Sequence, residues 1–113
     1  MVAVADVRAL ARTLPRSSEH LIRDRVKFRV GAIVYVAFSR DETTMGFAYP
    51  KADRDALVAG EPDLFFLPGA SDLRFHWVCC RLGLLDHPYL TELVGEAWRM
   101  VVPRFLARQR LDS

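Results

Sequence analysis

Charged and apolar side chains alternate most clearly over residues 23–47, which read RDRVKFRVGAIVYVAFSRDETTMGF. A period of two is typical of β-strands, and it breaks at Gly31 and again at residues 41–43. The pattern therefore predicts a meander of short antiparallel strands. Alternate side chains on a strand point to opposite faces, so the first strand carries a row of cations on one face. We refer to this set as the cationic row: Arg23, Arg25, Lys27 and Arg29.

The following segments complete the predicted sheet. Residues 33–39 are apolar on both faces, which is typical of a central strand. Residues 44–49 form the next strand, and residues 73–82 form a later one. Residues 16–19 read as a polar connection, and residues 20–24 either begin the first strand or form a short strand of their own.

Apolar residues recur at helical spacing in three other segments. A first helix spans residues 4–14 and ends before Pro15. A second spans residues 51–59, with Ala52, Ala56 and Leu57 turned inward and Gly60 as its C-terminal cap. The last helix starts after His87-Pro88, carries Trp98 on its apolar face and is interrupted at Pro103. A basic tail with Arg104 and Arg108 follows.

The order of these elements predicts the fold class. Helix, three-strand meander, helix, loop, strand and helix indicate an α+β protein, a two-layer sandwich with an antiparallel sheet of about four or five strands. The N- and C-terminal helices pack on that sheet. Residues 1–113 are expected to form a single domain. Its predicted core is Val26, Phe28, Val34, Val36, Leu93, Ala97 and Trp98.

Composition and charge add limits to this picture. No apolar run approaches the roughly 20 residues of a membrane span, and the charged N-terminal segment is unlike a signal peptide. We therefore expect a cytoplasmic protein without a membrane partner. The net charge of +2 is too small to argue for nucleic acid by itself. All basic residues except Lys27 and Lys51 are arginine, which suits phosphate recognition but also follows from a GC-rich coding sequence.

The cationic row has two interpretations. Its members lie ~6.6–6.8 Å apart along a strand, close to the separation of phosphates along one nucleic-acid strand. The row is then a binding surface for anions. Alternatively it is a solvated sheet face that prevents aggregation. Nearby aromatic residues can likewise stack bases or anchor a loop: Phe65, Phe66, Phe75 and Trp77, with Arg74 and His76 between them.

Catalytic and metal chemistry find little support in the residue pattern. The three histidines and the serines have no spacing typical of a nucleophile motif. The acidic residues lack the spacing of a calcium loop. Cys79 and Cys80 are adjacent, so one is expected to face the core and the other the opposite side of the sheet. We expect reduced thiols, no cofactor, no bound metal and no enzymatic activity.

Several segments together resemble the MmcQ/YjbR family over nearly the whole chain. They are VKFRVGAIVYVAF, TMGFAYPKADRDAL, EPD, PGASDLRFHWV and AWRMVVPRFLA. The resemblance implies a compact α+β fold similar to frataxin-like proteins and type III secretion chaperones. It also implies DNA binding through a double-wing surface formed by strands. The family brings no catalytic motif to this sequence. A departure at Arg104-Phe105, where a basic pair is usual, thins the charge of the tail.

Two functions remain open at this point. The first is a non-enzymatic domain that binds DNA weakly and without sequence preference. Its contacts would come from Arg23, Arg25, Lys27, Arg29, Arg104 and Arg108. The second is a protein-interaction module in which the sheet, or the loop at Phe65–Leu67, receives a partner chain. The sequence leaves the oligomeric state open.

Overall fold

The computed structural model describes the backbone of residues 2–112 and the side chains of residues 2–108. Within this range, helices lie at both ends of the chain and between some of the strands. The elements are α1 (Val4–Ala11), β1 (Ser17–Ile22), β2 (Arg25–Val30), β3 (Ile33–Phe38), β4 (Thr44–Ala48), α2 (Lys51–Gly60), β5 (Phe65–Phe66), the short 3-10 helix η1 (Ala70–Asp72), β6 (Trp77–Arg81), the 3-10 helix η2 (Leu82–Leu84), α3 (His87–Arg99) and α4 (Arg104–Asp112).

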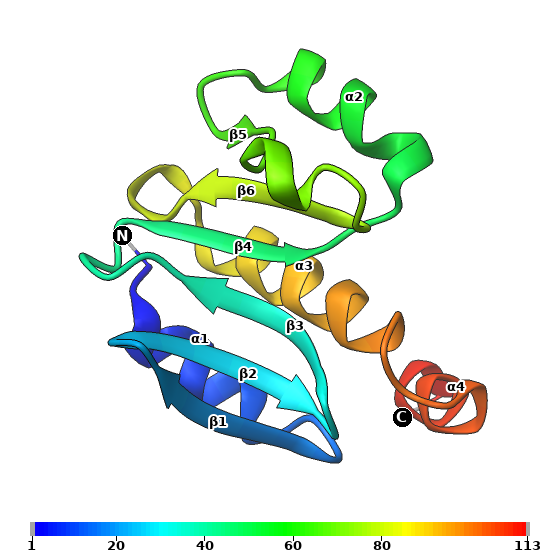
Figure 1. Cartoon of the computed structure of the whole chain (residues 1–113). Helices are drawn as coiled ribbons and strands as arrows, with labels where there is room; N and C mark the ends of the chain where they lie inside the picture. Colours follow the sequence, from blue (N-terminus) through cyan, green and yellow to red (C-terminus); the bar gives the residue numbers. More distant parts are fainter. Residues whose placement is uncertain (1, 113) are drawn as a thin grey trace.

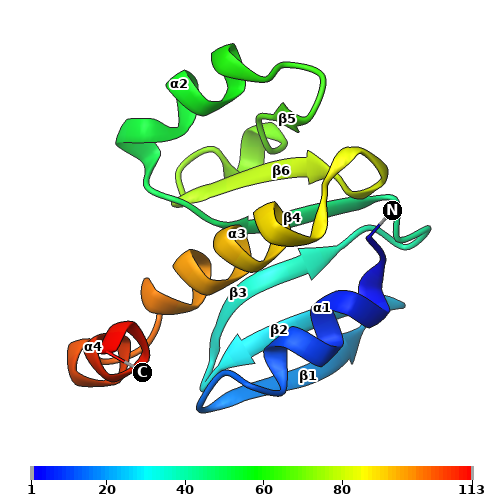
Figure 2. The same ribbon diagram turned by 180° about the vertical axis from the view of Figure 1, so that it is seen from behind.

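The strands form one antiparallel sheet in the order β1-β2-β3-β4-β6-β5. Helices α1 and α3 cover one face of this sheet, while the opposite face carries no long helix (Figures 1 and 2). Helix α4 lies beyond the end of the sheet where β3 begins (Figure 1). The predicted α+β fold with terminal helices on an antiparallel sheet is thus confirmed. The sheet has six strands rather than four or five.

Strand β1 corrects the predicted start of the sheet. Residues 17–19 were expected in a polar connection, but they belong to a strand that pairs with β2 along its whole length. A two-residue turn joins the two strands, and Arg23 and Asp24 both have positive φ there (53° and 65°). Positive φ at both central residues fits the twist of a tight hairpin. Arg23 therefore lies in a turn, not on the strand.

A β-bulge between β2 and β3 decides which residues enter the core. Phe28 pairs with Val36 and Arg29 pairs with Val34, so Tyr35 is left without a partner in the ladder. Tyr35 and Val36 are both buried, whereas Val34 is only half-buried and lies on the open face. The prediction that Val34 is a core residue was wrong, because the bulge shifts the alternation by one position.

The core lies between the sheet and helices α1 and α3. Phe28, Val36, Leu93, Ala97 and Trp98 are buried there as predicted, and Val26 is partly buried against the same cluster. The side chain of Trp98 is completely buried, and its Nε1–H donates a hydrogen bond of 2.8 Å to the carbonyl of Pro15. Trp98 thus ties α3 to the segment that follows α1.

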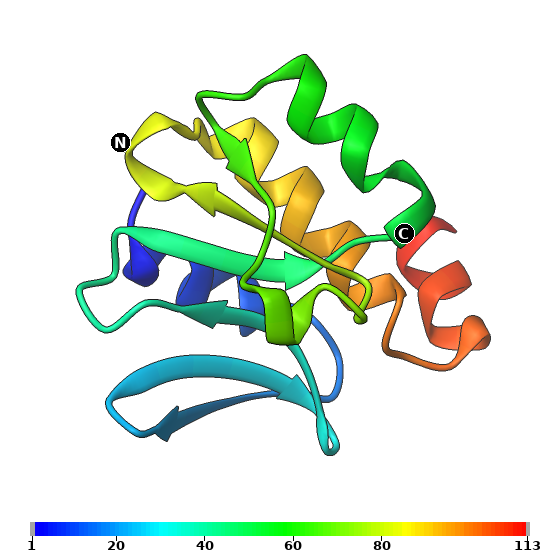
Figure 3. The same cartoon turned by 45° about the horizontal axis from the view of Figure 1, so that its top comes forward.

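Helix α2 packs differently from the prediction. Ala52 and Ala56 are exposed, and the buried residue of this helix is Arg54. The chain after β5 then crosses over the open face of the sheet before it enters β6 (Figure 3). Strand β6 begins at Trp77 and not at residue 73, because residues 70–76 form η1 and turns.

Candidate binding groove on the open face of the sheet

A groove of about 580 Å³ lies on the face of the sheet that the helices leave open. Its floor consists of small side chains from the central strands. Ala37 pairs with Gly46, and the row continues to Lys27 on one side and Cys79 on the other. Because the side chain of Ala37 is small, the floor at β3 lies lower than the flanking side chains. We call this feature the open-face groove.

Gly46 is required by the indole ring of Trp77. A Cβ atom at position 46 would lie 2.4 Å from Nε1 of Trp77, far inside van der Waals contact. The indole therefore lies over β4 at this point. Glycine inside a strand often marks such a close approach, so this signal was present in the sequence.

The loop between β5 and β6 forms one wall of the groove. It contributes Asp72 and Phe75, and Trp77 from the start of β6 continues the same wall. Arg54 holds this wall from behind. Its Nη1 donates to the carbonyls of Phe75 and Trp77, and its Nη2 donates to that of Leu73, each at 3.1 Å.

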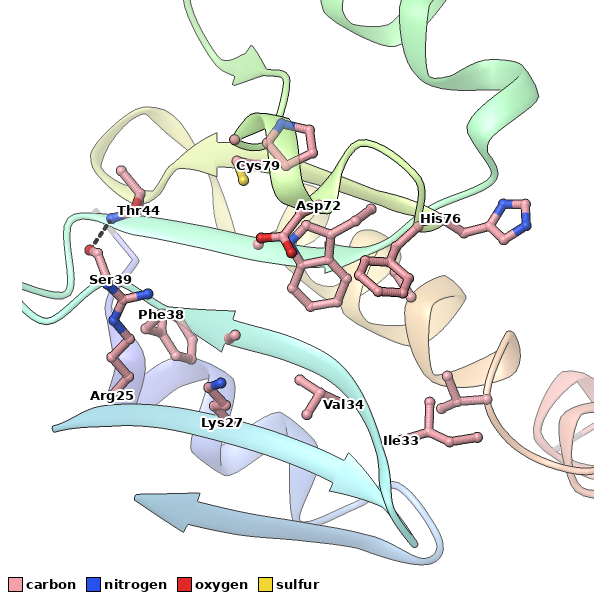
Figure 4. A pocket seen from close by; sticks show the side chains of 18 of the residues that line it. Arg25, Lys27, Ile33, Val34, Phe38, Ser39, Thr44, Asp72, His76 and Cys79 are labelled. Carbon is pink, nitrogen blue, oxygen red and sulfur yellow. Dashed lines mark hydrogen bonds between the residues drawn. The ribbon is translucent and has the colours of Figure 1, made fainter. Parts of the chain in front are cut away.

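Arg25 and Lys27 form the opposite wall. Both project from β2 onto the open face, and Asp72 extends over β4 from the other side (Figure 4). Arg25 is exposed and Lys27 is half-buried. Within the described side chains neither forms an ion pair, and Asp72 is the acidic residue that lines the groove. The groove thus combines aromatic and cationic walls over an apolar floor.

The other predicted site residues lie elsewhere. Nη2 of Arg29 lies 3.2 Å from both ring nitrogens of His20. Arg29 follows Arg25 and Lys27 at alternate positions of β2, so it continues the cationic row beyond the groove. Arg23 lies in the β1–β2 turn. Arg104 and Arg108 are exposed on α4 and do not line the groove. The structure thus brings two of the predicted cations, Arg25 and Lys27, into the groove.

The two cysteines point to opposite faces, as predicted. Cys80 is buried in the core, and Cys79 lines the groove; both are free thiols. Burial raises the pKa of Cys79 to about 11 and that of Cys80 to about 12. Both thiols are therefore protonated at neutral pH, which makes them weak nucleophiles.

The histidines make specific contacts. Nδ1 of His76 accepts a hydrogen bond from the backbone N–H of Lys51 (3.0 Å), and the imidazole points away from the groove (Figure 4). His20 contacts the hydroxyl of Ser18 at 2.8 Å, outside the groove. Sequence reasoning did not anticipate this contact, because it depends on β1.

Across the part of the chain that the structure describes, no three His, Cys, Asp or Glu side chains are grouped as metal ligands would be. None of the helices in the described range has the length and apolar character needed to cross a bilayer.

Comparison with known proteins places this fold in a family. The family model for YjbR matches residues 12–100. The chain belongs to the YjbR family. A crystal structure of Deinococcus radiodurans protein DR2400, described with the family domain DUF419, is similar with a TM-score of 0.77 and 22% sequence identity. The similarity covers 99% of this chain and 89% of that one. No protein with a curated description matches the chain significantly.

These comparisons confirm the resemblance drawn from the sequence segments. At this level of identity the solved structure shows that the fold is shared, and it carries no statement about function. The segments that carried the resemblance also build the open-face groove. VKFRVGAIVYVAF contains β3 and all of β2 except Arg25, and PGASDLRFHWV contains the aromatic wall.

Proposed function

We propose that this YjbR-family protein is a non-enzymatic domain that binds DNA weakly, and without sequence preference, through the open face of its sheet. The observation that carries the proposal is the position of Arg25 and Lys27. Both lie on a sheet face that no long helix covers, and within the described side chains neither is neutralised by an ion pair. Cations in this setting bind phosphates and release condensed counterions.

The states of Cys79 and His76 in the groove favour binding over catalysis. Its thiol is protonated at neutral pH, and His76 uses Nδ1 to hold the start of α2. A nucleophile needs an adjacent base, or a lowered pKa, to react at this pH. The groove provides contacts to a ligand without such an arrangement.

Binding of labelled duplex DNA can be followed by fluorescence anisotropy at several salt concentrations. In the double variant Arg25→Gln/Lys27→Gln, two phosphate contacts are lost, so the log–log salt slope should fall by about 1.8. The matched control is Arg12→Gln/Lys51→Gln, which removes the same charge from two exposed residues outside the groove. Its slope should stay close to that of the unmodified protein. Equal losses in both variants would contradict the proposal, as would no binding at low salt.

A second candidate function is a protein-interaction module with no nucleic-acid role. The observation in its favour is the apolar rim of the groove, where Ile33, Phe75 and Met100 are exposed. Exposed apolar side chains grouped together often mark a protein interface. The same titration separates the two functions, because absence of DNA binding at low salt leaves the protein partner as the better explanation.

A further inference from the structure

We propose that the open-face groove holds one unpaired base of a single-stranded nucleic acid, stacked against Trp77, with its phosphate at Arg25 and Lys27. This inference rests on the proposed function and adds that the preferred nucleic acid is single-stranded. Three features of the groove carry it: its width, its aromatic wall and the separation between that wall and the cations.

The open face of the sheet is too wide to enter the major groove of a DNA duplex. The groove reaches from β2 across β3 and β4 to β6, which is three inter-strand gaps. At ~4.8 Å per gap this is about 14 Å before side chains are added. The major groove of B-DNA is only about 12 Å wide. A duplex can therefore lie on the rim, but its base edges cannot reach the floor.

The aromatic wall offers a surface that paired bases do not use. In a duplex both faces of each base are already stacked, whereas an unpaired base can stack on an aromatic side chain. Trp77 lies over Gly46 at the groove floor, and Arg54 fixes the backbone of the wall at both Phe75 and Trp77. The stacking surface is thus held in place before a ligand arrives.

The separation of the two walls suits a base with its own phosphate. Lys27 and Gly46 lie in one row across the sheet, two inter-strand gaps apart. This places the indole over Gly46 about 10 Å from the backbone of Lys27. Ala37 occupies the position between them, and its small side chain leaves the depth that a ring requires. The volume of about 580 Å³ also falls in the range of small-ligand sites.

A base with a phosphate can come from a strand or from a free nucleotide. The cationic row favours a strand, because Arg29 extends it past the groove along β2. A polymer can use this additional cation, whereas a mononucleotide in the groove cannot.

Tryptophan emission offers a direct test, since the chain contains two tryptophans in contrasting positions. Single-stranded oligothymidylate should quench Trp77, which lines the groove, and leave the completely buried Trp98 unchanged. The Trp77→Phe variant retains only Trp98 and should show no quenching. Single strands should bind about 5- to 150-fold more tightly than a duplex of equal length, the range expected for one stacked base.

The Ala37→Leu variant fills the groove without removing charge. We expect it to abolish the quenching and to reduce single-strand affinity by about 5- to 150-fold, with duplex affinity changed less than about twofold. Circular dichroism confirms that the variant is folded. If it is not, Trp77→Leu removes the stacking surface instead, and it should lower single-strand affinity by about 5- to 150-fold with duplex affinity changed less than about twofold. Ala56→Leu, at an exposed site outside the groove, is the control for an added leucine.

The outcomes separate this inference from the proposed function. If duplex and single strand bind equally and no quenching occurs, the inference is wrong and DNA binding stands. If thymidine monophosphate quenches Trp77 as strongly as the oligonucleotide at equal base concentration, the strand is not the ligand and the inference is wrong. If neither duplex nor oligonucleotide binds at low salt, both proposals fail.

Discussion

Gly46 allows the aromatic wall of the open-face groove to lie close to β4, because the indole of Trp77 occupies the space that any side chain at this position would need. Its neighbours in β4, Met45 and Phe47, are fully buried on the other face. One residue in the middle of a strand thus connects the core on one side with the candidate site on the other. Substitution there should affect both stability and the position of Trp77.

Gly46→Ala is expected to destabilise the protein by about 1–3 kcal/mol, as overpacking does in a close-packed region. The indole must move, so the emission maximum of Trp77 should shift as well. The control is Gly95→Ala in α3, where a Cβ meets no atom within 4 Å. That change should stabilise by roughly 0.5–1 kcal/mol, because alanine is the better helix former. Urea unfolding measures both, and an unchanged free energy for Gly46→Ala would contradict the packing described.

Residue-scale details show what the sequence could and could not predict. The cations at positions 25 and 27 follow from simple alternation, and so does the division of Cys79 and Cys80 between two faces. The burial of Tyr35 does not, because a β-bulge has no reliable signal in a single sequence. Arg54 was also missed, since an arginine between Asp53 and Asp55 in a helix reads as a solvated residue.

The segment between β5 and β6 illustrates how one element depends on another. Residues 70–76 have little regular structure, yet they form the aromatic wall of the groove. The guanidinium of Arg54 in α2 binds three carbonyls of this segment and of Trp77. Arginine can do this because its donors form a rigid fork, whereas a lysine ammonium is a single point charge.

Replacing Arg54 with Met should destabilise the protein by on the order of 3 kcal/mol, since charge-assisted hydrogen bonds to three carbonyls are lost. Arg54→Lys should recover only part of this stability. Lys51→Met, an exposed site in the same helix, should change stability by no more than about 0.5 kcal/mol. Hydrogen exchange at residues 70–76 should accelerate only in the Arg54 variants. Equal exchange in all variants would show that Arg54 does not hold the loop.

Strand β1 was hidden in the sequence for a physical reason. Its inward side chains contact α1 and β3 through polar groups and not through apolar ones. Glu19 accepts hydrogen bonds from Arg8 at 2.8–3.0 Å, and the hydroxyl of Ser17 meets that of Tyr35. A period-two pattern of hydrophobicity therefore never appears there. Strand β2 was predicted to begin too early, because Arg23 in the turn continues the alternation of cations along β2.

At the scale of the whole molecule, Trp98 joins the two ends of the fold. It lies in α3, is completely buried against the core, and donates to the carbonyl of Pro15 near the N-terminus. Aromatic side chains of this size dominate the energetics of small cores. The amphipathic pattern of residues 88–101 predicted this role for Trp98. The fold class was predicted from the order of helices and strands along the chain.

Trp98→Ala should destabilise the protein by about 3–5 kcal/mol, the usual range for removing a large core side chain. Trp98→Phe keeps much of the packing but loses the hydrogen bond to Pro15, so a smaller loss is expected. Thermal and urea unfolding measure both variants. A loss near zero for the alanine variant would mean that α3 does not anchor the sheet.

The division of the sheet into two faces has a consequence for how this family can diversify. Helices α1 and α3 cover the face that holds the buried core (Figure 2), and the groove lies on the opposite face. Substitutions at exposed or half-buried groove positions such as Arg25, Lys27 and Ala37 therefore leave the core packing unchanged. A new ligand preference can arise at such positions while folding is preserved. We expect relatives with this same backbone to recognise chemically different molecules.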